Sequence, residues 1–209
     1  ERVHLDSIEA LYELHFHARD IAEFSTRPLH HPVLPLLLDT GYARRCMATS
    51  PLPSGGFAFP DDAAAQIAQG LRFMEDRIQR PIGMWPSEGS MCPEIIPVLA
   101  ENGVRWAMTD QALLEAEGNH FSPWNVQVGN GKIVVFFRDR ALSDAFGFDY
   151  HKMGDREAVA DFDRRLGAAQ GWGARVVSIA LDGENPWEYY PAHAGLFLRR
   201  LADYLKTSG

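Results

Sequence analysis

Cysteine and long apolar runs are scarce in this sequence. Its two cysteines, Cys46 and Cys92, are too few for a disulfide scaffold and lack the C-x-x-C spacing of many metal sites. The longest apolar runs, such as Val176 to Leu181, are far shorter than the roughly 20 residues that span a bilayer. No charged segment followed by an apolar one opens the chain. We therefore expect a soluble protein without a membrane partner, located in the cytoplasm.

Positive charge is scarce as well. Lysine and arginine number 20 against 28 aspartates and glutamates, which gives a formal charge of −8 and a pI near 5.4. Nucleic-acid binding relies on clustered basic side chains that displace counterions from phosphates. The sequence also lacks a glycine-rich phosphate-binding motif. We expect no nucleic-acid partner, no cofactor and no metal ion.

Strand patterns and helix patterns alternate along the chain. With 209 residues, 46% of them hydrophobic, the chain can bury one substantial core, and we expect a single domain over residues 1–209. Apolar residues at helical spacing predict the helices, and short apolar runs predict the strands. The expected helices cover residues 2–17, 60–80, 93–102, 155–170 and 191–206, and the expected strands cover residues 21–26, 82–85, 104–108, 132–138 and 176–181.

This alternation predicts an α/β fold in which helices cover a parallel sheet. The continuous apolar segment 132–138 is typical of a strand that is buried on both faces. Prolines at 28, 32 and 35 predict a loop up to Leu36, and residues 50–60 are expected to form a long flexible loop. On the last helix, Phe197, Leu198, Leu201 and Leu205 are expected to face inward.

Acids and histidines follow the expected strands at their carboxyl ends, where α/β proteins collect their chemistry. Aromatic residues such as Trp85, Phe148, Tyr150 and Trp187 lie near them in the sequence. Carboxylates accept hydrogen bonds from hydroxyls, and aromatic rings stack on sugar faces, so the pattern indicates a carbohydrate substrate. The strand-end residues are His30, His31, Glu88, Asp110, Asp139, Asp144, Asp182 and Glu184.

An acid after a strand is often a helix cap or a solvated loop residue, and Asp110 is expected to be one of these. Glu88 is less easily explained in this way, because it lies in a tight turn between Trp85 and Pro93 that consists mainly of small residues. Asp182 directly follows an apolar strand. The sequence therefore predicts two acids, supplied by different strands, as candidates for chemistry.

Four segments carry a resemblance to a known family. They are "EFSTRPLHHPVLPLL", "GMWPSEGSM", "VVFFRDRALSDAFGFDY" and "IALDGENPWEYYP", which follow one another between Glu23 and Pro191. In this order they resemble the motifs of glycoside hydrolase family 57, whose members act on α-glucans as α-amylases, amylopullulanases, branching enzymes and 4-α-glucanotransferases. The resemblance implies a distorted (β/α)7 barrel, incomplete in this chain, and a retaining mechanism on α-1,4 or α-1,6 linkages.

The resemblance also implies roles for single residues. It assigns the nucleophile to Glu88 and the general acid/base to Asp182. Retention requires two carboxyls roughly 5 to 5.5 Å apart, one ionised and one protonated, in environments that separate their pKa values. Negative charge on Asp144 and Glu184 is expected to help keep Asp182 protonated. The expected substrate-binding residues are His31, Trp85, Arg138, Asp139, Asp144, Glu184 and Trp187.

One motif of the family is missing. Its members begin the barrel with a strand that ends in His-Gln-Pro, and no His-Gln-Pro occurs in this sequence. Three explanations stay open: the chain is a piece of a larger enzyme, a second copy or another chain completes the site, or the protein is a shortened relative with altered activity. The expected substrate partner is an α-glucan or a maltooligosaccharide.

Two other classes of function also stay open. A non-catalytic glucan-binding protein would keep the stacking aromatics without turnover. A metal-dependent carbohydrate deacetylase would recruit His30, His31 and Asp182 as zinc ligands. Adjacent histidines in a proline-rich loop point in different directions, which argues against this second alternative.

Overall fold

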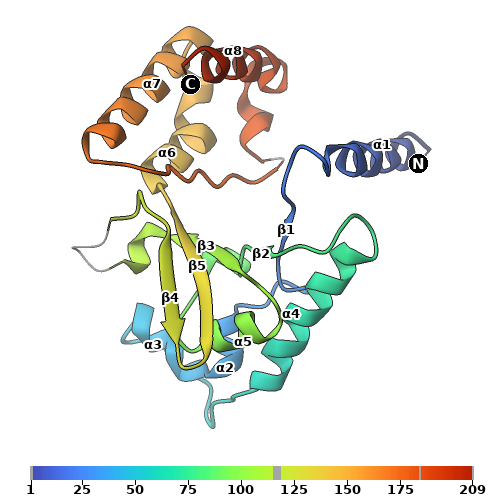
Figure 1. Ribbon diagram of the computed structural model, residues 1–209, viewed down its shortest axis with the longest axis vertical. Coiled ribbons are helices and arrows are strands. Elements are labelled where there is room, and N and C mark those ends of the chain that lie inside the picture. The colour runs from blue at the N-terminus through green and yellow to red at the C-terminus, as the bar shows by residue number, and fades with distance from the viewer. Residues whose placement is uncertain (1, 115–118, 184, 209) are drawn as a thin grey trace. The chain divides into compact units, whose positions relative to one another are not determined.

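The computed structural model describes residues 2–114, 119–183 and 185–208, which fall into two compact units (Figure 1). The first, the sheet unit, comprises Glu1–Thr109 and Trp124–Val135. The second, the helical unit, comprises Asp110–Pro123 and Phe136–Gly209. The single domain expected over residues 1–209 stays a prediction.

Five described strands form one sheet: β1 (Ser25–Thr26), β2 (Gly83–Met84), β3 (Trp106–Asp110), β4 (Trp124–Val128) and β5 (Gly131–Arg138). The sheet has the order β1-β2-β3-β5-β4. Parallel pairing joins β1 to β2 and β2 to β3, whereas β4 and β5 form an antiparallel hairpin. Because β1 and β4 lie at opposite ends of this order, the described strands form an open sheet and not a closed barrel.

The parallel strands are held together partly by the indole of Trp106 on β3. A Cβ atom at Gly83 of β2 would lie 2.0 Å from this ring, so the position has no room for a side chain. The indole Nε1 donates a 2.6 Å hydrogen bond to Oε1 of Glu23, just before β1. One side chain of β3 therefore contacts β2 and reaches the segment that leads into β1.

The helices of the sheet unit begin where the sequence favours them. At the start of α4, Pro60 needs no N–H partner, and the carboxylates of Asp61 and Asp62 suit the positive end of the helix dipole. Ala63, Ile67 and Leu71 then recur every four residues and form the buried face. The described helices of the sheet unit have the following bounds: α1 Arg2–Ala18, α2 Leu34–Leu38, η1 Thr40–Tyr42, α3 Ala43–Cys46, α4 Pro60–Glu75, η2 Ser87–Gly89 and α5 Ile95–Glu101.

The helical unit is organised around aromatic side chains. Phe146 makes edge-to-face contacts with Tyr150, Phe162 and Phe197, at ring-centroid distances of 5.2, 5.6 and 5.8 Å. The hydroxyl of Tyr190 donates a 2.6 Å hydrogen bond to the carbonyl of Phe146. The described helices of this unit have the following bounds: η3 Gln111–Leu113, α6 Arg140–Asp144, η4 Ala145–Asp149, η5 Tyr150–Lys152, α7 Asp155–Gly171, η6 Asn185–Tyr189, η7 Pro191–Ala194 and α8 Gly195–Thr207.

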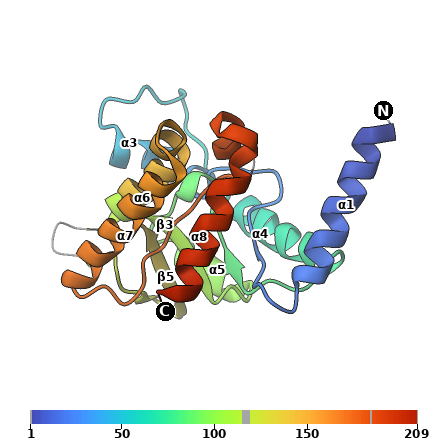
Figure 2. The ribbon, with the colours of Figure 1, turned by 90° about the horizontal axis from the view of Figure 1, so that it is seen from above.

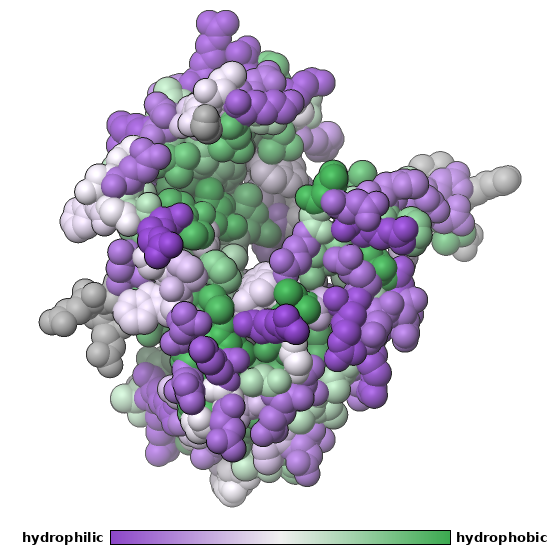
Figure 3. Space-filling model, in the orientation of Figure 1, coloured by the Kyte–Doolittle hydropathy of each residue, from purple (hydrophilic) through white to green (hydrophobic). Residues whose placement is uncertain are grey.

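Helices α7 and α8 cover this aromatic core and pack against each other (Figures 1 and 2). The Tyr204 hydroxyl of α8 donates a 2.6 Å hydrogen bond to Asp163 of α7. Phe197 faces inward as expected, but Leu198 and Leu205 are 39% and 53% exposed, which corrects the inward orientation expected for them. Hydrophobic residues of this unit thus also reach its surface, where the visible face carries a continuous apolar area (Figure 3).

Two strand predictions were wrong. The apolar segment 176–181 forms no strand; a single parallel bridge joins its Ser178 to Arg138. Strand β5 was expected to be buried on both faces, yet only alternate residues, such as Ile133 and Val135, are buried. Strand β4 was missed, because the expected strands were taken from apolar runs, whereas β4 alternates polar and apolar residues and is largely exposed.

Other boundaries differ by a few residues. The strand expected over residues 21–26 is limited to Ser25–Thr26, and α4 ends at Glu75 instead of continuing to Arg80. The loop expected up to Leu36 contains the start of α2, because Pro35 falls in the first helical turn, where proline is tolerated. Among the described residues, no helix combines the length and the apolar content that a membrane crossing requires.

Candidate active site

Glu88 lies on a short turn just beyond the carboxyl end of β2. Backbone hydrogen bonds from Gly89 N to Pro86 O (2.8 Å) and from Ser90 N to Ser87 O (3.0 Å) close the turn. Glu88 takes the left-handed conformation, with φ 59° and ψ 19°, and Gly89 follows with φ 63°. Ser87 and Gly89 are buried, whereas the Glu88 side chain is 73% exposed. The turn is therefore anchored inside the unit and presents one carboxylate outward.

His31 lies on a second turn, just beyond the carboxyl end of β1. Its backbone N–H donates to Pro28 O at 3.0 Å, and its φ of 57° is also left-handed. Gln66 of α4 holds the preceding residues: its carbonyl accepts from Leu29 N at 3.2 Å, and its side-chain Oε1 accepts from His30 N at 2.9 Å. The imidazole is thus carried by a turn that is fixed from the adjacent helix.

The two turns bring His31 and Glu88 together. Nε2 of His31 lies 3.7 Å from Oε1 of Glu88. Because β1 and β2 are parallel neighbours, their carboxyl ends meet at the same sheet edge, as the sequence predicted for strand-end residues. The side chains are 41% and 73% exposed, so the pair contributes only about 0–1 kcal/mol.

This contact does not offset the backbone cost on its own. A left-handed backbone costs a non-glycine residue roughly 1–2 kcal/mol, and both partners adopt it. The buried anchors of the two turns must therefore hold these conformations. Strain that is kept in place by its surroundings is common at active sites, which favours a functional role for this pair.

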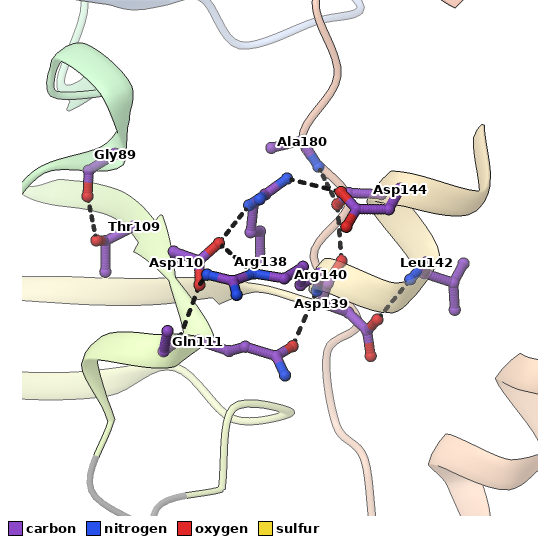
Figure 4. A network of polar contacts seen from close by, with 12 residues as sticks. Gly89, Thr109, Asp110, Gln111, Arg138, Asp139, Arg140, Leu142, Asp144 and Ala180 are labelled. Carbon is purple, nitrogen blue, oxygen red and sulfur yellow. Dashed lines mark hydrogen bonds and ion pairs between the residues drawn. The ribbon is translucent and has the colours of Figure 1, made fainter. Parts of the chain in front are cut away.

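Thr109 of β3 supplies one of these anchors. Its hydroxyl donates a 2.5 Å hydrogen bond to the carbonyl of Gly89, and the side chain is 2% exposed (Figure 4). The sequence reasoning missed this residue, because it considered only acids and histidines at the strand ends. The available signal was a hydroxyl residue at the last buried position of a strand whose residues alternate between buried and half-buried.

Arg138 lies at the end of β5 in the helical unit, between two carboxylates (Figure 4). Its Nε donates to Oδ2 of Asp110 at 2.7 Å, and its Nη1 lies 3.7 Å from Oδ1 of Asp144. Oδ1 of Asp110 also accepts from Ala112 N at 2.8 Å and from Nη2 of Arg140 at 2.7 Å. The expected cap role of Asp110 is therefore confirmed, but the same side chain also fixes Arg138.

The surroundings of Asp110 change its acidity. Burial alone would raise its pKa, but the amide of Ala112 and the guanidiniums of Arg140 and Arg138 lower it below the ordinary value for aspartate. The carboxylate is thus held in its charged form. This arrangement orients Arg138 at the strand end, where the resemblance had implied a substrate-binding role.

Asp139 is the N-cap of α6 and is 8% exposed. Its Oδ1 accepts from Leu142 N at 2.7 Å, and its Oδ2 lies 3.2 Å from Nε2 of His120. The ring of His120 in turn lies 3.9 Å, between centroids, from that of Phe121. Sequence reasoning missed His120, because no spacing or strand pattern around "GNHFS" links it to the end of β5.

The segment that leads to Asp182 is tied to α6. Asp139 N donates to Ser178 O at 2.7 Å, and Ala180 N donates to Oγ of Ser143 at 3.2 Å. Asp182 follows this attachment in an exposed position. Glu184, expected beside it, lies outside the described residues.

The two tryptophans expected to bind substrate occupy half-buried positions. The backbone N–H of Trp85 donates to Thr26 O at 2.8 Å, which places Trp85 just beyond the paired part of β2. The indole Nε1 of Trp187 donates to Gly183 O at 3.1 Å, and its ring lies 5.6 Å, between centroids, from that of Tyr190.

The candidate site residues are divided between the two units. The sheet unit contains His31, Trp85 and Glu88. The helical unit contains Arg138, Asp139, Asp144, Asp182 and Trp187.

Comparison with known families decides the identity of the chain. The sequence profile of Glycosyl hydrolase family 57 matches residues 3–209. The chain belongs to this family. The resemblance based on four segments is thereby confirmed over nearly the whole sequence. No curated protein matches the chain.

Solved structures support the family 57 fold. A 4-α-glucanotransferase from Thermococcus litoralis matches 92% of the chain, with 18% identity and a TM-score of 0.62. The α-amylase AmyC from Thermotoga maritima matches 95% of it, with 14% identity and a TM-score of 0.66. A Mycobacterium smegmatis protein described as a polysaccharide deacetylase matches 69% of it, with 19% identity and a TM-score of 0.51.

The chain spans only part of these proteins: 28% of the glucanotransferase, 48% of the amylase and 50% of the deacetylase-like protein. The expected fold class, a parallel-sheet (β/α)7-type barrel that is incomplete in this chain, is confirmed by these similarities together with the open sheet order.

Proposed function

We propose that this chain forms the catalytic part of a retaining glycoside hydrolase or glucanotransferase that acts on α-1,4 or α-1,6 linkages of starch-like or glycogen-like glucans. The observation that carries the proposal is the exposed Glu88 carboxylate, held in a strained turn 3.7 Å from His31 in a chain of glycosyl hydrolase family 57. The names of two similar structures, a 4-α-glucanotransferase and an α-amylase, support the same substrate class.

In the proposed mechanism, Glu88 is the nucleophile and Asp182 the general acid/base. Ionised Glu88 attacks the anomeric carbon while protonated Asp182 donates its proton to the leaving glycosidic oxygen, and a covalent glycosyl-enzyme forms. Deprotonated Asp182 then takes a proton from water or from a sugar hydroxyl, and that oxygen displaces Glu88. Water gives hydrolysis and a sugar hydroxyl gives transfer, with the anomeric configuration retained in both cases.

His31 has a defined role in this proposal. Its Nε2 lies 3.7 Å from Oε1 of Glu88, so it orients the carboxylate and leaves the other oxygen for attack. The fixed turn beneath His31, held by Gln66, limits how far the imidazole can move. A contact that fixes a reacting group close to its attack geometry lowers the entropic part of the activation barrier of the reaction.

The remaining subsite residues are proposals of the same kind. Arg138 is held in place by Asp110, and its guanidinium can donate to sugar hydroxyls. The indole of Trp187 is held by its hydrogen bond to Gly183 O and can offer a ring face for stacking on a sugar. We propose that the glucan is bound by His31, Trp85, Arg138, Asp139, Asp144, Glu184 and Trp187.

The test measures product formation from maltoheptaose and amylose by the purified chain. We expect Glu88→Gln and Asp182→Asn to lose activity by at least about 100-fold, because each removes a group that acts in the transition state. Glu101→Gln on α5 and Asp203→Asn on α8 are matched controls, since both carboxylates are exposed and neither is part of the proposed site. Full rates in both Glu88→Gln and Asp182→Asn would refute the assignment.

Chemical rescue by azide separates the two roles. With 4-nitrophenyl α-maltosides, azide should restore turnover of Glu88→Ala and give a β-glycosyl azide, because the anion replaces the nucleophile directly. With Asp182→Ala, azide should attack the glycosyl-enzyme instead and give an α-glycosyl azide. The reverse pattern, read from the anomeric proton by NMR, would exchange the two assignments.

A metal-dependent carbohydrate deacetylase is a second candidate, favoured by the similarity to the protein described as a polysaccharide deacetylase. In this second candidate function, the zinc ligands would be His30, His31 and Asp182. Within the described residues, however, no group of three or more histidine, cysteine, aspartate or glutamate side chains could hold a metal ion. Release of acetate from an acetylated glucan, abolished by a chelator and restored by Zn²⁺, would favour this reading over the first.

A further inference from the structure

Gly89 follows Glu88 in the turn and has a φ of 63°. Glycine tolerates many backbone conformations, so the orientation of the peptide after Gly89 depends on its two hydrogen bonds: Ser90 N donates to Ser87 O at 3.0 Å, and Gly89 O accepts from Thr109. Glu88, in contrast, holds an unfavourable left-handed conformation and would relax if the next peptide were free to rotate. The hydrogen bond from Thr109 to the Gly89 carbonyl is the contact that ties this peptide to the sheet, whereas the bond from Ser90 N stays within the turn.

We propose that Thr109 is a positioning residue, which fixes the Gly89 peptide and thereby the direction in which Glu88 presents its carboxylate. This inference rests on the proposed function of Glu88 as the nucleophile. Thr109 itself is only 2% exposed, so it acts through the turn and not by contact with the sugar.

The sheet register explains why Thr109 is in reach of the turn. Met84 of β2 pairs with Ala107 of β3, and Thr109 lies two residues further along β3 on the same buried face as Ala107. Its hydroxyl therefore points to the side on which β2 continues into the buried residues of the turn, Ser87 and Gly89. Ser87 offers no substitute, since its own buried Oγ has no hydrogen-bond partner among the described residues.

The kinetic test compares Thr109→Val with Thr109→Ser. Valine keeps the shape of threonine but cannot donate, whereas serine keeps the hydroxyl and loses a methyl group. We expect Thr109→Val to lower kcat on maltooligosaccharides about tenfold with KM changed by less than about twofold, because the carboxylate is misdirected while sugar contacts remain. Thr109→Ser should keep kcat within about twofold of the wild type.

A second measurement reads the turn directly and needs no activity. The dipeptide Gly-Ser occurs once in the sequence, at residues 89 and 90. Labelling with carbonyl-¹³C glycine and ¹⁵N serine therefore gives a single NMR correlation, which reports the Gly89 carbonyl. We expect this signal to be the same in the wild type and Thr109→Ser, and to move to lower carbonyl frequency in Thr109→Val, where the donated hydrogen bond is lost.

The outcomes separate this inference from the proposed function. If Thr109→Ser is as impaired as Thr109→Val, or if Thr109→Val keeps both kcat and the Gly89 signal, the positioning role is wrong. If Glu88→Gln is fully active, the nucleophile assignment fails, while the Gly89 signal still decides whether Thr109 fixes the turn. Thr109→Ala replaces Thr109→Val in both measurements if the valine variant does not fold.

Discussion

His31 and Glu88 contact each other from the ends of two neighbouring parallel strands, and both hold a left-handed backbone. Their φ angles are 57° and 59°, and Nε2 of His31 lies 3.7 Å from Oε1 of Glu88. Neither residue is glycine, so both conformations are unfavourable in isolation. The surrounding structure therefore maintains strain on both sides of one contact, which is the basis for the first prediction.

Removing the Glu88 side chain should reveal this backbone strain. Glu88→Gly and Glu88→Ala both delete the carboxylate, but only glycine relieves the cost of the left-handed conformation. We expect the glycine variant to have a free energy of unfolding about 1 kcal/mol higher than the alanine variant, measured by urea denaturation. At the exposed helical position Glu101, the order of the two variants should be reversed. The same order at both positions would contradict the strained turn.

Gly70 of α4 is required for close contact with the segment after β1. A Cβ atom there would lie 2.2 Å from the backbone carbonyl oxygen of Arg27, which cannot move without displacing the chain. We expect Gly70→Ala to lower the free energy of unfolding by about 2 kcal/mol. Gly167→Ala in the middle of α7 is the matched control, since no atom lies within 4 Å of its added Cβ. This variant should be more stable than the wild type by about 0.5–1 kcal/mol.

The hydrogen bonds to Asp110 should make stability depend on pH. Its lowered folded-state pKa means that this stabilisation is complete above the unfolded value of about 3.9 and is lost as the pH falls through it toward the folded pKa. We expect Asp110→Asn to lose about 2 kcal/mol at pH 7 and to differ less from the wild type at pH values of about 3. Urea denaturation of Asp110→Asn and of the wild type at several pH values measures this difference. A constant difference across the pH range would contradict the linkage.

The two cysteines should differ strongly in reactivity. Burial raises the pKa of the Cys92 thiol to about 11, and only 9% of the residue is exposed, whereas Cys46 is exposed on α3. We expect one thiol to react rapidly with a disulfide reagent at pH 8 and the second only on unfolding. Cys46→Ser should abolish the rapid reaction, and rapid labelling that persists in this variant would disprove the assignment.

The strand-end residues were predictable because parallel pairing obeys a simple rule. The segments around β1 and β2 were recognised from short apolar runs, and parallel neighbours bring their carboxyl ends to one edge, so His31 and Glu88 were expected there. Their left-handed backbones were not predictable, because histidine and glutamate carry no signal for positive φ. The conformation depends on anchors such as Thr109 and Gln66, which come from other parts of the chain.

The strand expected at Val176–Leu181 failed for a related reason. An apolar, β-branched run favours extended backbone, but a strand also requires a partner along its length. Here only Ser178 bridges Arg138, and its carbonyl accepts from Asp139 N. The neighbouring backbone groups bond elsewhere: Val176 N donates to Phe121 O, and Ala180 N donates to the Ser143 side chain. Local periodicity contains no information about which partner is available.

The register of β2 against β3 also has a consequence for how the protein folds. A slip of one residue between these strands would turn Thr109 to the opposite face of the sheet and remove the support beneath the Glu88 turn. Under the proposed roles of Thr109 and Glu88, misaligned chains would lack the proposed activity even if they were compact. Recovery of the proposed activity during refolding should therefore report correct strand alignment, and not merely collapse of the chain.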